Sequence, residues 1–175
     1  MNTKPIYKNK WIWGWEDDKE EAWLRQLANE GLHLVRPAGL GRYAFQAGAP
    51  RDMVYRMDYF GSRRADYQQY LQIFRDAGWE LVGEFFNWQY FRKPVEHGES
   101  PEILTDNESK IRKYQNLLTT IALTAPVSII SIIMITEKSL STFMLILIGI
   151  LTLICGFDAF CIAALLRRIN QLKRI

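Results

Sequence analysis

Seven residues of types that bind ligands fall in short strand-like segments within the first 80 positions. Tryptophan and phenylalanine supply apolar contact area, and charged groups fix the orientation of a bound molecule. Aromatic ring faces beside carboxylates also favour a cationic ligand. We therefore predict that a small aromatic or cationic molecule, or a regulator protein, binds at this set: Trp11, Trp13, Trp15, Arg56, Asp58, Phe60 and Glu80.

The same residues also have a purely structural interpretation. Aromatic residues are favoured in strands whatever the function, and Arg56 with Asp58 or Glu80 would form an ordinary cross-strand ion pair. His33 fits an exposed strand position better than the role of a ligand or a base. Both interpretations remain open from the sequence.

Catalytic chemistry has little support in the sequence. The chain has two histidines, two cysteines and no clustered pair of acids, which leaves no nucleophile with its base and no set of metal ligands. Glycine-rich phosphate-binding motifs are also absent. We expect a protein that is not an enzyme and that uses neither a metal nor another cofactor.

The elements that must position these residues form two similar halves. Helical spacing follows Asp18, the predicted N-cap of a first helix that ends at Gly31, and Ser62 is the predicted cap of a second helix that ends at Gly78. A shift of 47 residues superposes the two halves. The matched positions are Trp13-Gly14 with Phe60-Gly61, Trp23-Leu24 with Tyr70-Leu71, Leu27 with Phe74, and Gly31 with Gly78.

Alternating apolar residues predict three strands in each half. The segments are 11–15, 32–36 and 42–46 around the first helix, and 54–60, 79–85 and 88–93 around the second. Each half therefore has the order βαββ. We predict an α+β domain with a duplicated βαββ unit, an antiparallel-rich sheet and two helices on one face, with the seven residues above on the other face.

Two long apolar runs follow this domain. Residues 117–136 contain no charge, and residues 142–166 contain only Asp158. Each run can cross a bilayer, and the five residues 137–141 leave room only for a tight extracytoplasmic turn. The rest divides into a cytoplasmic domain 1–94, a polar linker and juxtamembrane helix start 95–116, and a basic tail 167–175. A buried helical hairpin of a soluble protein is the alternative interpretation.

The distribution of charge supports this membrane interpretation. Residues 1–116 carry 17 basic and 17 acidic residues, whereas residues 117–175 carry five basic and two acidic ones. Basic residues flank the outer ends of both runs, so the positive-inside rule predicts cytoplasmic N- and C-termini in the cell membrane. The excess positive charge is that of a membrane flank, so we expect the lipid bilayer as a partner and no nucleic acid.

Six residues of the second run are candidates for helix packing or for a partner. Small residues at regular spacing permit close helix contacts, either within the hairpin or in a homo-oligomer. Asp158 would be costly in a bilayer unless it pairs, so it either bonds within the hairpin or contacts a partner protein or an ion. The set is Gly149, Cys155, Gly156, Asp158, Ala159 and Ala163.

Several of these motifs together resemble the bacterial family of domain of unknown function 2812 (DUF2812). They are Trp23-Leu24 to Gly31, Tyr55-Arg56-Met57-Asp58-Tyr59, Gly78-Trp79-Glu80, Phe91-Arg92-Lys93-Pro94 and Thr105-Asp106 to Ser109-Lys110. The resemblance covers about residues 8–114, although Leu32 stands where the family often has tryptophan. It implies no known activity. Genes of the family often lie beside those of PadR-like regulators, which implies a regulatory role at the membrane.

A tandem βαββ pair is also similar to the gyrase-inhibitor-like fold, whose two modules bracket a small-molecule cleft. The leading hypothesis is therefore a non-enzymatic, membrane-anchored cytoplasmic sensor or interaction module. The alternative hypothesis is an accessory subunit of a membrane transporter or resistance complex, recognised through Asp158 and the small residues.

Overall fold

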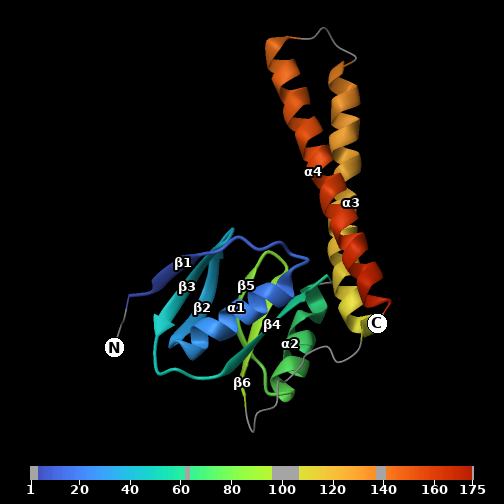
Figure 1. Cartoon of the computed structure of the whole chain (residues 1–175). Coiled ribbons are helices and arrows are strands. Elements are labelled where there is room, and N and C mark those ends of the chain that lie inside the picture. Colours follow the sequence, from blue (N-terminus) through green and yellow to red (C-terminus); the bar gives the residue numbers. More distant parts are fainter. Residues whose placement is uncertain (1–3, 62–63, 96–106, 137–140, 175) are drawn as a thin grey trace. The chain divides into compact units, whose positions relative to one another are not determined.

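The computed structural model describes residues 4–61, 64–95, 107–136 and 141–174 (Figure 1). The chain divides into two compact units, Met1–Thr105 and Asp106–Ile175, and each is described by itself. Residues 96–106 of the predicted linker and residues 137–140 of the predicted turn 137–141 lie outside the described residues. So does Ser62, the predicted cap of the second helix.

The first unit is an α+β domain, as predicted. Its elements are β1 (Ile6–Asn9), α1 (Asp17–Asn29), β2 (Leu32–Gly39), β3 (Arg42–Ala47), β4 (Met53–Tyr59), a 3-10 turn (Arg64–Asp66), α2 (Tyr67–Asp76), β5 (Glu80–Phe85) and β6 (Trp88–Pro94). The strands form two antiparallel three-stranded sheets. The first sheet has the order β1-β3-β2 and the second has the order β4-β6-β5.

The two halves share more than the order of their elements. In each sheet the third strand of the repeat lies between the first and the second. The second strand of each repeat also has a register shift, at Val35 in β2 and at Val82 in β5, which again are 47 residues apart. A bulge at equivalent positions is a feature of backbone geometry that chance similarity of sequence does not supply. The structure therefore supports the predicted duplication.

The layers differ from the predicted single sheet with both helices on one face. On β4, Met53, Tyr55 and Met57 pack with α1 and the first sheet, whereas Val54 packs with α2. Neighbouring strand residues point to opposite faces. Helices α1 and α2 therefore cover opposite faces of the second sheet. Helix α1 also packs against the first sheet, so it contacts both repeats.

The segment 11–15 is not the predicted strand. Strand β1 ends at Asn9, and the backbone N–H of Glu16 donates to the carbonyl of Trp13 at 2.8 Å in a turn that leads into α1. The strand was predicted from tryptophans at every second position. In the structure these tryptophans contact each other through their rings without forming a strand. Helix α1 begins at Asp17, so Asp18 is not its N-cap either.

Both helices of this unit end as predicted. Gly31 has φ +84° and Gly78 has φ +79°, the left-handed conformation that favours glycine at the end of a helix. At Gly31 a side chain would also be excluded by space, because a Cβ atom would lie 2.7 Å from the carbonyl oxygen of Gly48.

The second unit consists of two long helices that pack against each other, α3 (Asn107–Thr136) and α4 (Thr142–Leu172). Both are long and apolar enough to cross a membrane. At the start of α4 the Ser141 hydroxyl accepts a hydrogen bond from the Met144 N–H. Between the two helices, the Arg168 Nε atom of α4 donates to the Tyr114 hydroxyl of α3 at 3.4 Å.

One face of α4 is buried and another is open. The buried positions are Asp158, Cys161, Leu165 and Ile169, which recur every three or four residues. Gly149, Gly156, Ala159 and Ala163 are exposed, and a Cβ atom at either glycine would meet nothing within 4 Å. Of the predicted packing residues, Asp158 and the half-buried Cys155 therefore lie on or beside the buried face, and the other four lie on the open one.

Candidate functional site

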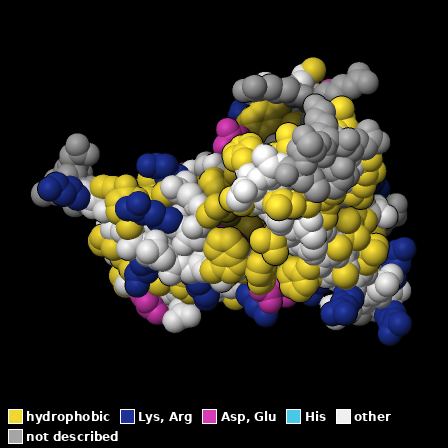
Figure 2. Space-filling model, turned by 90° about the horizontal axis from the view of Figure 1, so that it is seen from above, with side chains coloured by type: hydrophobic (Ala, Val, Ile, Leu, Met, Phe, Trp, Pro, Cys, Tyr) yellow, Lys and Arg dark blue, Asp and Glu magenta, His cyan; other side chains and the backbone are white. Residues whose placement is uncertain are grey.

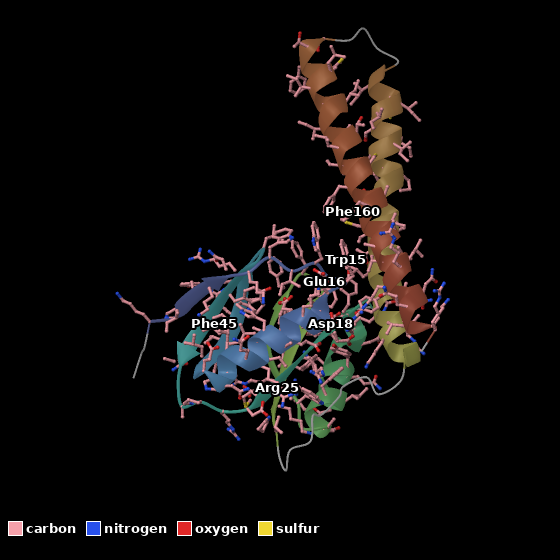
Figure 3. All side chains as sticks on the ribbon, in the orientation of Figure 1. Trp15, Glu16, Asp18, Arg25, Phe45 and Phe160 are labelled. Carbon is pink, nitrogen blue, oxygen red and sulfur yellow. The ribbon has the colours of Figure 1, made fainter. Side chains whose placement is uncertain are left out.

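The seven predicted binding residues belong to several separate groups of contacts. The three tryptophans form one group in the turn before α1. The rings of Trp11 and Trp13 meet edge to face at 5.5 Å between centroids, and those of Trp13 and Trp15 stack at 5.1 Å. Figure 3 shows Trp15 and Glu16 together at the beginning of α1.

Arg56 and Glu80 are engaged in ion pairs with other elements. The Arg56 Nη1 atom lies 3.3 Å from Glu21 Oε2 of α1, and both side chains are largely buried. The Arg92 guanidinium donates to both oxygens of Glu80 at 2.7 and 2.8 Å, across the β5–β6 pair. The cross-strand pair expected for Glu80 is therefore present, but its partner is Arg92 and not Arg56.

Asp58 and Phe60 are brought together by α2. The Tyr70 hydroxyl donates to Asp58 Oδ2 at 3.0 Å. The Phe60 ring centroid lies 4.7 Å from that of Tyr70 and 5.0 Å from that of Tyr67. Two of the seven predicted residues thus share a site with two tyrosines of α2 that are not among the predicted binding residues.

A row of polar side chains crosses the second sheet at this point. Asp58 of β4 is directly opposite Gln89 of β6, which in turn is opposite Glu84 of β5. Residues directly opposite each other have their side chains on the same face. The Tyr67 hydroxyl lies 2.8 Å from Gln89 Oε1 and 3.0 Å from Glu84 Oε2, so the helix covers the row with its two tyrosines.

We refer to these six residues as the α2-side cluster: Asp58, Phe60, Tyr67, Tyr70, Glu84 and Gln89. The amide of Gln89 is buried, Glu84 is exposed and the other four are half-buried, so the cluster is open at one side. Burial, then Glu84, raises the pKa of Tyr67 to about 12. Burial, then Asp58, likewise raises the pKa of Tyr70. Both hydroxyls therefore stay protonated at neutral pH and donate to the row.

This arrangement can bind a cation but offers little for catalysis. Two carboxylates stand beside three aromatic rings, and an organic cation gains from both. The tyrosine protons are held tightly, which makes these hydroxyls poor nucleophiles at neutral pH. Among the described residues there is no group of three or more His, Cys, Asp or Glu side chains that could hold a metal ion.

A second polar centre, which the sequence analysis missed, lies between the two repeats. Glu20 of α1 is only 4 % exposed, and the Tyr90 hydroxyl of β6 donates to its Oε1 atom at 2.9 Å. Tyr43 of β3 is also hydrogen-bonded to this carboxyl group. Burial, the largest cause, raises the pKa of Glu20, neighbouring Asp17 raises it further, and the tyrosines and Lys10 oppose the shift.

One signal in the sequence does point to Glu20. It lies four residues before Leu24 and seven before Leu27, so it continues the apolar face of α1. A charge on the buried face of a helix needs hydrogen-bond partners. Those partners come from distant strands, which is why the spacing marks Glu20 but does not identify them.

His33 is a strand-surface residue, as its position in the sequence indicates. Its Nε2 atom lies 2.8 Å from the carbonyl oxygen of Ala49, just after β3. It is half-buried against Gly48, whose Cβ would lie 3.0 Å from the ring. These contacts give it a role in holding the end of the hairpin.

Comparison with known proteins places most of this domain in one family. A family model described as "Protein of unknown function (DUF2812)" matches residues 16–125. The match includes α1, both sheets apart from β1, the α2-side cluster and part of α3. No curated protein and no solved structure matches the chain.

Proposed function

The chain belongs to the DUF2812 family, and we propose that it is a non-enzymatic, membrane-anchored sensor whose α2-side cluster binds an organic cation. The ligand state of the domain would then be communicated to a regulator protein at the membrane. The observation that carries the proposal is the row of Asp58, Gln89 and Glu84 beneath the rings of Tyr67 and Tyr70.

The proposed location rests on the second unit. Helices α3 and α4 have the length and composition of membrane spans, and Lys and Arg concentrate near the start of α3 and around the end of α4. This distribution supports a two-pass hairpin in the cell membrane with both termini in the cytoplasm. Fusion of a reporter that is active on only one side of the membrane, placed in turn at each terminus and at residues 137–141, tests this topology.

The chemistry of the cluster supports a cationic ligand. Each aromatic ring presents a negative face, and the two carboxylates add charge at the same surface. A quaternary ammonium group forms no hydrogen bonds. The ring faces and carboxylates would therefore bind it without displacing the hydrogen bonds that the Tyr67 and Tyr70 hydroxyls form. A neutral molecule of the same shape would gain only the apolar contact.

The test compares two such molecules on the full-length protein in nanodiscs. Isothermal titration with benzyltrimethylammonium is expected to show binding, and the neutral analogue with carbon in place of nitrogen is expected to bind at least about tenfold more weakly. Asp58→Asn and Glu84→Gln should each weaken binding of the cation several-fold. Asp76→Asn, at an exposed acid at the end of the same helix, is the matched control and should change nothing.

The proposal fails if cation and neutral analogue bind equally, or if both carboxamide variants retain full affinity. Two further variants test the wider set from the sequence. Loss of binding in Glu80→Gln or Trp13→Ala, with Asp58→Asn unaffected, would place the binding site at those residues of the predicted set and not at the α2-side cluster.

A second candidate function follows from the open face of α4. Gly149, Gly156, Ala159 and Ala163 are exposed in the hairpin, so they remain available to another helix. This supports a role as accessory subunit of a membrane transporter or resistance complex, or as a homo-oligomer. If replacement of residues 115–175 by an unrelated two-span anchor preserves function, this second candidate is excluded.

A further inference from the structure

One end of the first sheet presents large apolar side chains to solvent. The Lys10 N–H donates to the Gly41 carbonyl at 2.7 Å, which joins the segment after β1 to the turn between β2 and β3. Trp11 follows Lys10, and its Cα atom would lie 3.5 Å from a Cβ atom on Gly41. The side chains of Leu40 and Trp11 are 69 % and 59 % exposed, and Tyr7 of β1 is 45 % exposed.

Basic side chains surround these apolar ones. The Arg42 guanidinium lies 4.3 Å from the ring centroid of Tyr7, and Lys10 Nζ lies 4.9 Å from that of Trp23. Lys10 also faces the buried Glu20 carboxyl group, so its charge is partly balanced within the protein. We call this surface the sheet-end patch: Tyr7, Lys10, Trp11, Leu40 and Arg42.

We propose that the sheet-end patch docks on the surface of a bilayer that contains anionic lipids. Tryptophan, tyrosine and the long stems of lysine and arginine are the side chains that partition to the headgroup region. The positive charge of the patch is complementary to anionic headgroups. Figure 2 shows the side chains coloured by type, with hydrophobic ones in yellow and Lys and Arg in dark blue.

The composition of the patch favours a lipid surface over another protein. Cores of protein interfaces are depleted in charged residues, whereas here Lys10 and Arg42 lie beside the three apolar residues. Strand β1 has only four residues, so it offers little edge for pairing with a second copy. The inference rests on the proposed membrane location, because the hairpin keeps the domain close to the bilayer.

Docking would place the patch at the level of the lipid headgroups. Leu40 and Trp11 would enter the interface, and Lys10 and Arg42 would contact phosphate groups. The cytoplasmic domain would then have two attachments to the membrane, one through the hairpin and one through the patch. The second attachment depends on lipid composition, since it requires anionic lipid.

Fluorescence quenching at single labelled cysteines tests the proposal in the full chain. Cys155→Ala and Cys161→Ala remove the native thiols, and Leu40→Cys carries an environment-sensitive NBD label. Ile73→Cys, at a similarly exposed apolar residue of α2, is the matched control. Each protein is reconstituted in phosphatidylcholine vesicles with or without phosphatidylglycerol, and with lipid that carries a doxyl quencher near the headgroup.

The label at position 40 is expected to be quenched by the doxyl lipid at least about twofold more than the label at position 73. This difference should shrink without phosphatidylglycerol, and also in Arg42→Gln protein. Equal quenching by doxyl lipid at positions 40 and 73 would overturn the proposal. So would a label at position 40 that is shielded from iodide but not quenched by lipid, because a protein would then cover the patch.

A third label separates this inference from the proposed function. Leu145→Cys lies on an exposed face of α4, and its label should be quenched by lipids with the doxyl group deep in the acyl chain. If position 145 is not quenched, the hairpin is not in the bilayer and the proposed location fails. If position 145 is quenched and position 40 is not, the sheet-end patch alone is rejected.

Discussion

Tyr43 and Tyr90 occupy equivalent positions in the two repeats, 47 residues apart, and both are hydrogen-bonded to the buried carboxyl group of Glu20. Tyr43 comes from the first sheet, Tyr90 from the second, and Glu20 from the helix between them. One acid therefore ties the duplicated halves together. Burial, followed by the nearby Glu20 charge, raises the pKa of both tyrosines, so their hydroxyls remain protonated donors.

Replacement of Glu20 is expected to distinguish its hydrogen bonds from its charge. Glu20→Gln keeps an oxygen acceptor for the tyrosines, whereas Glu20→Ala leaves two buried hydroxyls without it. We expect Glu20→Ala to lower the free energy of unfolding by about 1–3 kcal/mol more than Glu20→Gln. Urea unfolding of the first unit in the full-length protein, followed by tryptophan fluorescence, measures both. Equal losses would show that the acceptor contributes nothing.

The raised pKa of Glu20 also predicts how stability changes with pH. Between the ordinary pKa of glutamate and the raised one, the folded protein holds a proton that the unfolded chain has released. Stability from this group is therefore complete below the ordinary pKa and falls as pH rises through the raised one. The wild type should lose stability over this interval relative to Glu20→Gln. Parallel pH profiles of the two proteins would contradict the assignment.

Loss of either tyrosine hydroxyl should weaken the junction of the repeats. Tyr43→Phe and Tyr90→Phe each remove one donor to Glu20, at a cost of about 1 kcal/mol in the free energy of unfolding. In a Glu20→Gln background, the Tyr43→Phe/Tyr90→Phe double variant should lose less free energy of unfolding than the sum of the two single-variant losses measured with Glu20 present. The reason is that the three side chains share one network. Tyr7→Phe, at an exposed tyrosine, is the control. Strict additivity in both backgrounds would argue against a shared network.

The two positions Gly31 and Gly149 should respond in opposite ways to alanine. Gly31 has positive φ and no room for a Cβ atom, so Gly31→Ala should destabilise the first unit by roughly 1–3 kcal/mol. Gly149 lies within α4 with open space around it, so Gly149→Ala should leave the hairpin folded. Thermal unfolding of each variant in detergent, with the wild type alongside, checks this. A stable Gly31→Ala protein would require the end of α1 to adopt another backbone conformation.

Asp158 is the candidate in the proposed membrane hairpin for contact with a partner. It lies on the buried face of α4, and Asp158→Asn preserves its size and hydrogen-bonding groups while it removes the charge. We expect the variant to retain the hairpin but to change which membrane proteins co-purify from native membranes. Leu153→Asn, on the exposed face, controls for polarity in the span. An identical set of co-purifying proteins would leave Asp158 with a structural role only.

The elements and their order could be predicted from sequence because each depends on local patterning. Alternation of apolar residues predicts β2 to β6, helical spacing predicts α1 and α2, and Gly31 and Gly78 mark the ends of these helices. The same reasoning was wrong at residues 11–15, where ring stacking of tryptophans produces a strand-like spacing without a strand. The lengths of the apolar runs identify α3 and α4 in the same local way.

The grouping of side chains was decided by tertiary structure alone. The sequence contains Asp58 and Phe60 as candidates, but only the packing of α2 brings Tyr67 and Tyr70 onto them. Glu20 contacts both Tyr43 and Tyr90 only because α1 packs against both sheets. Spacing along the chain specifies which face of an element a residue occupies, because that follows from backbone geometry. Which faces meet depends on how the layers bury apolar surface between segments distant in the chain, and local sequence does not encode that choice.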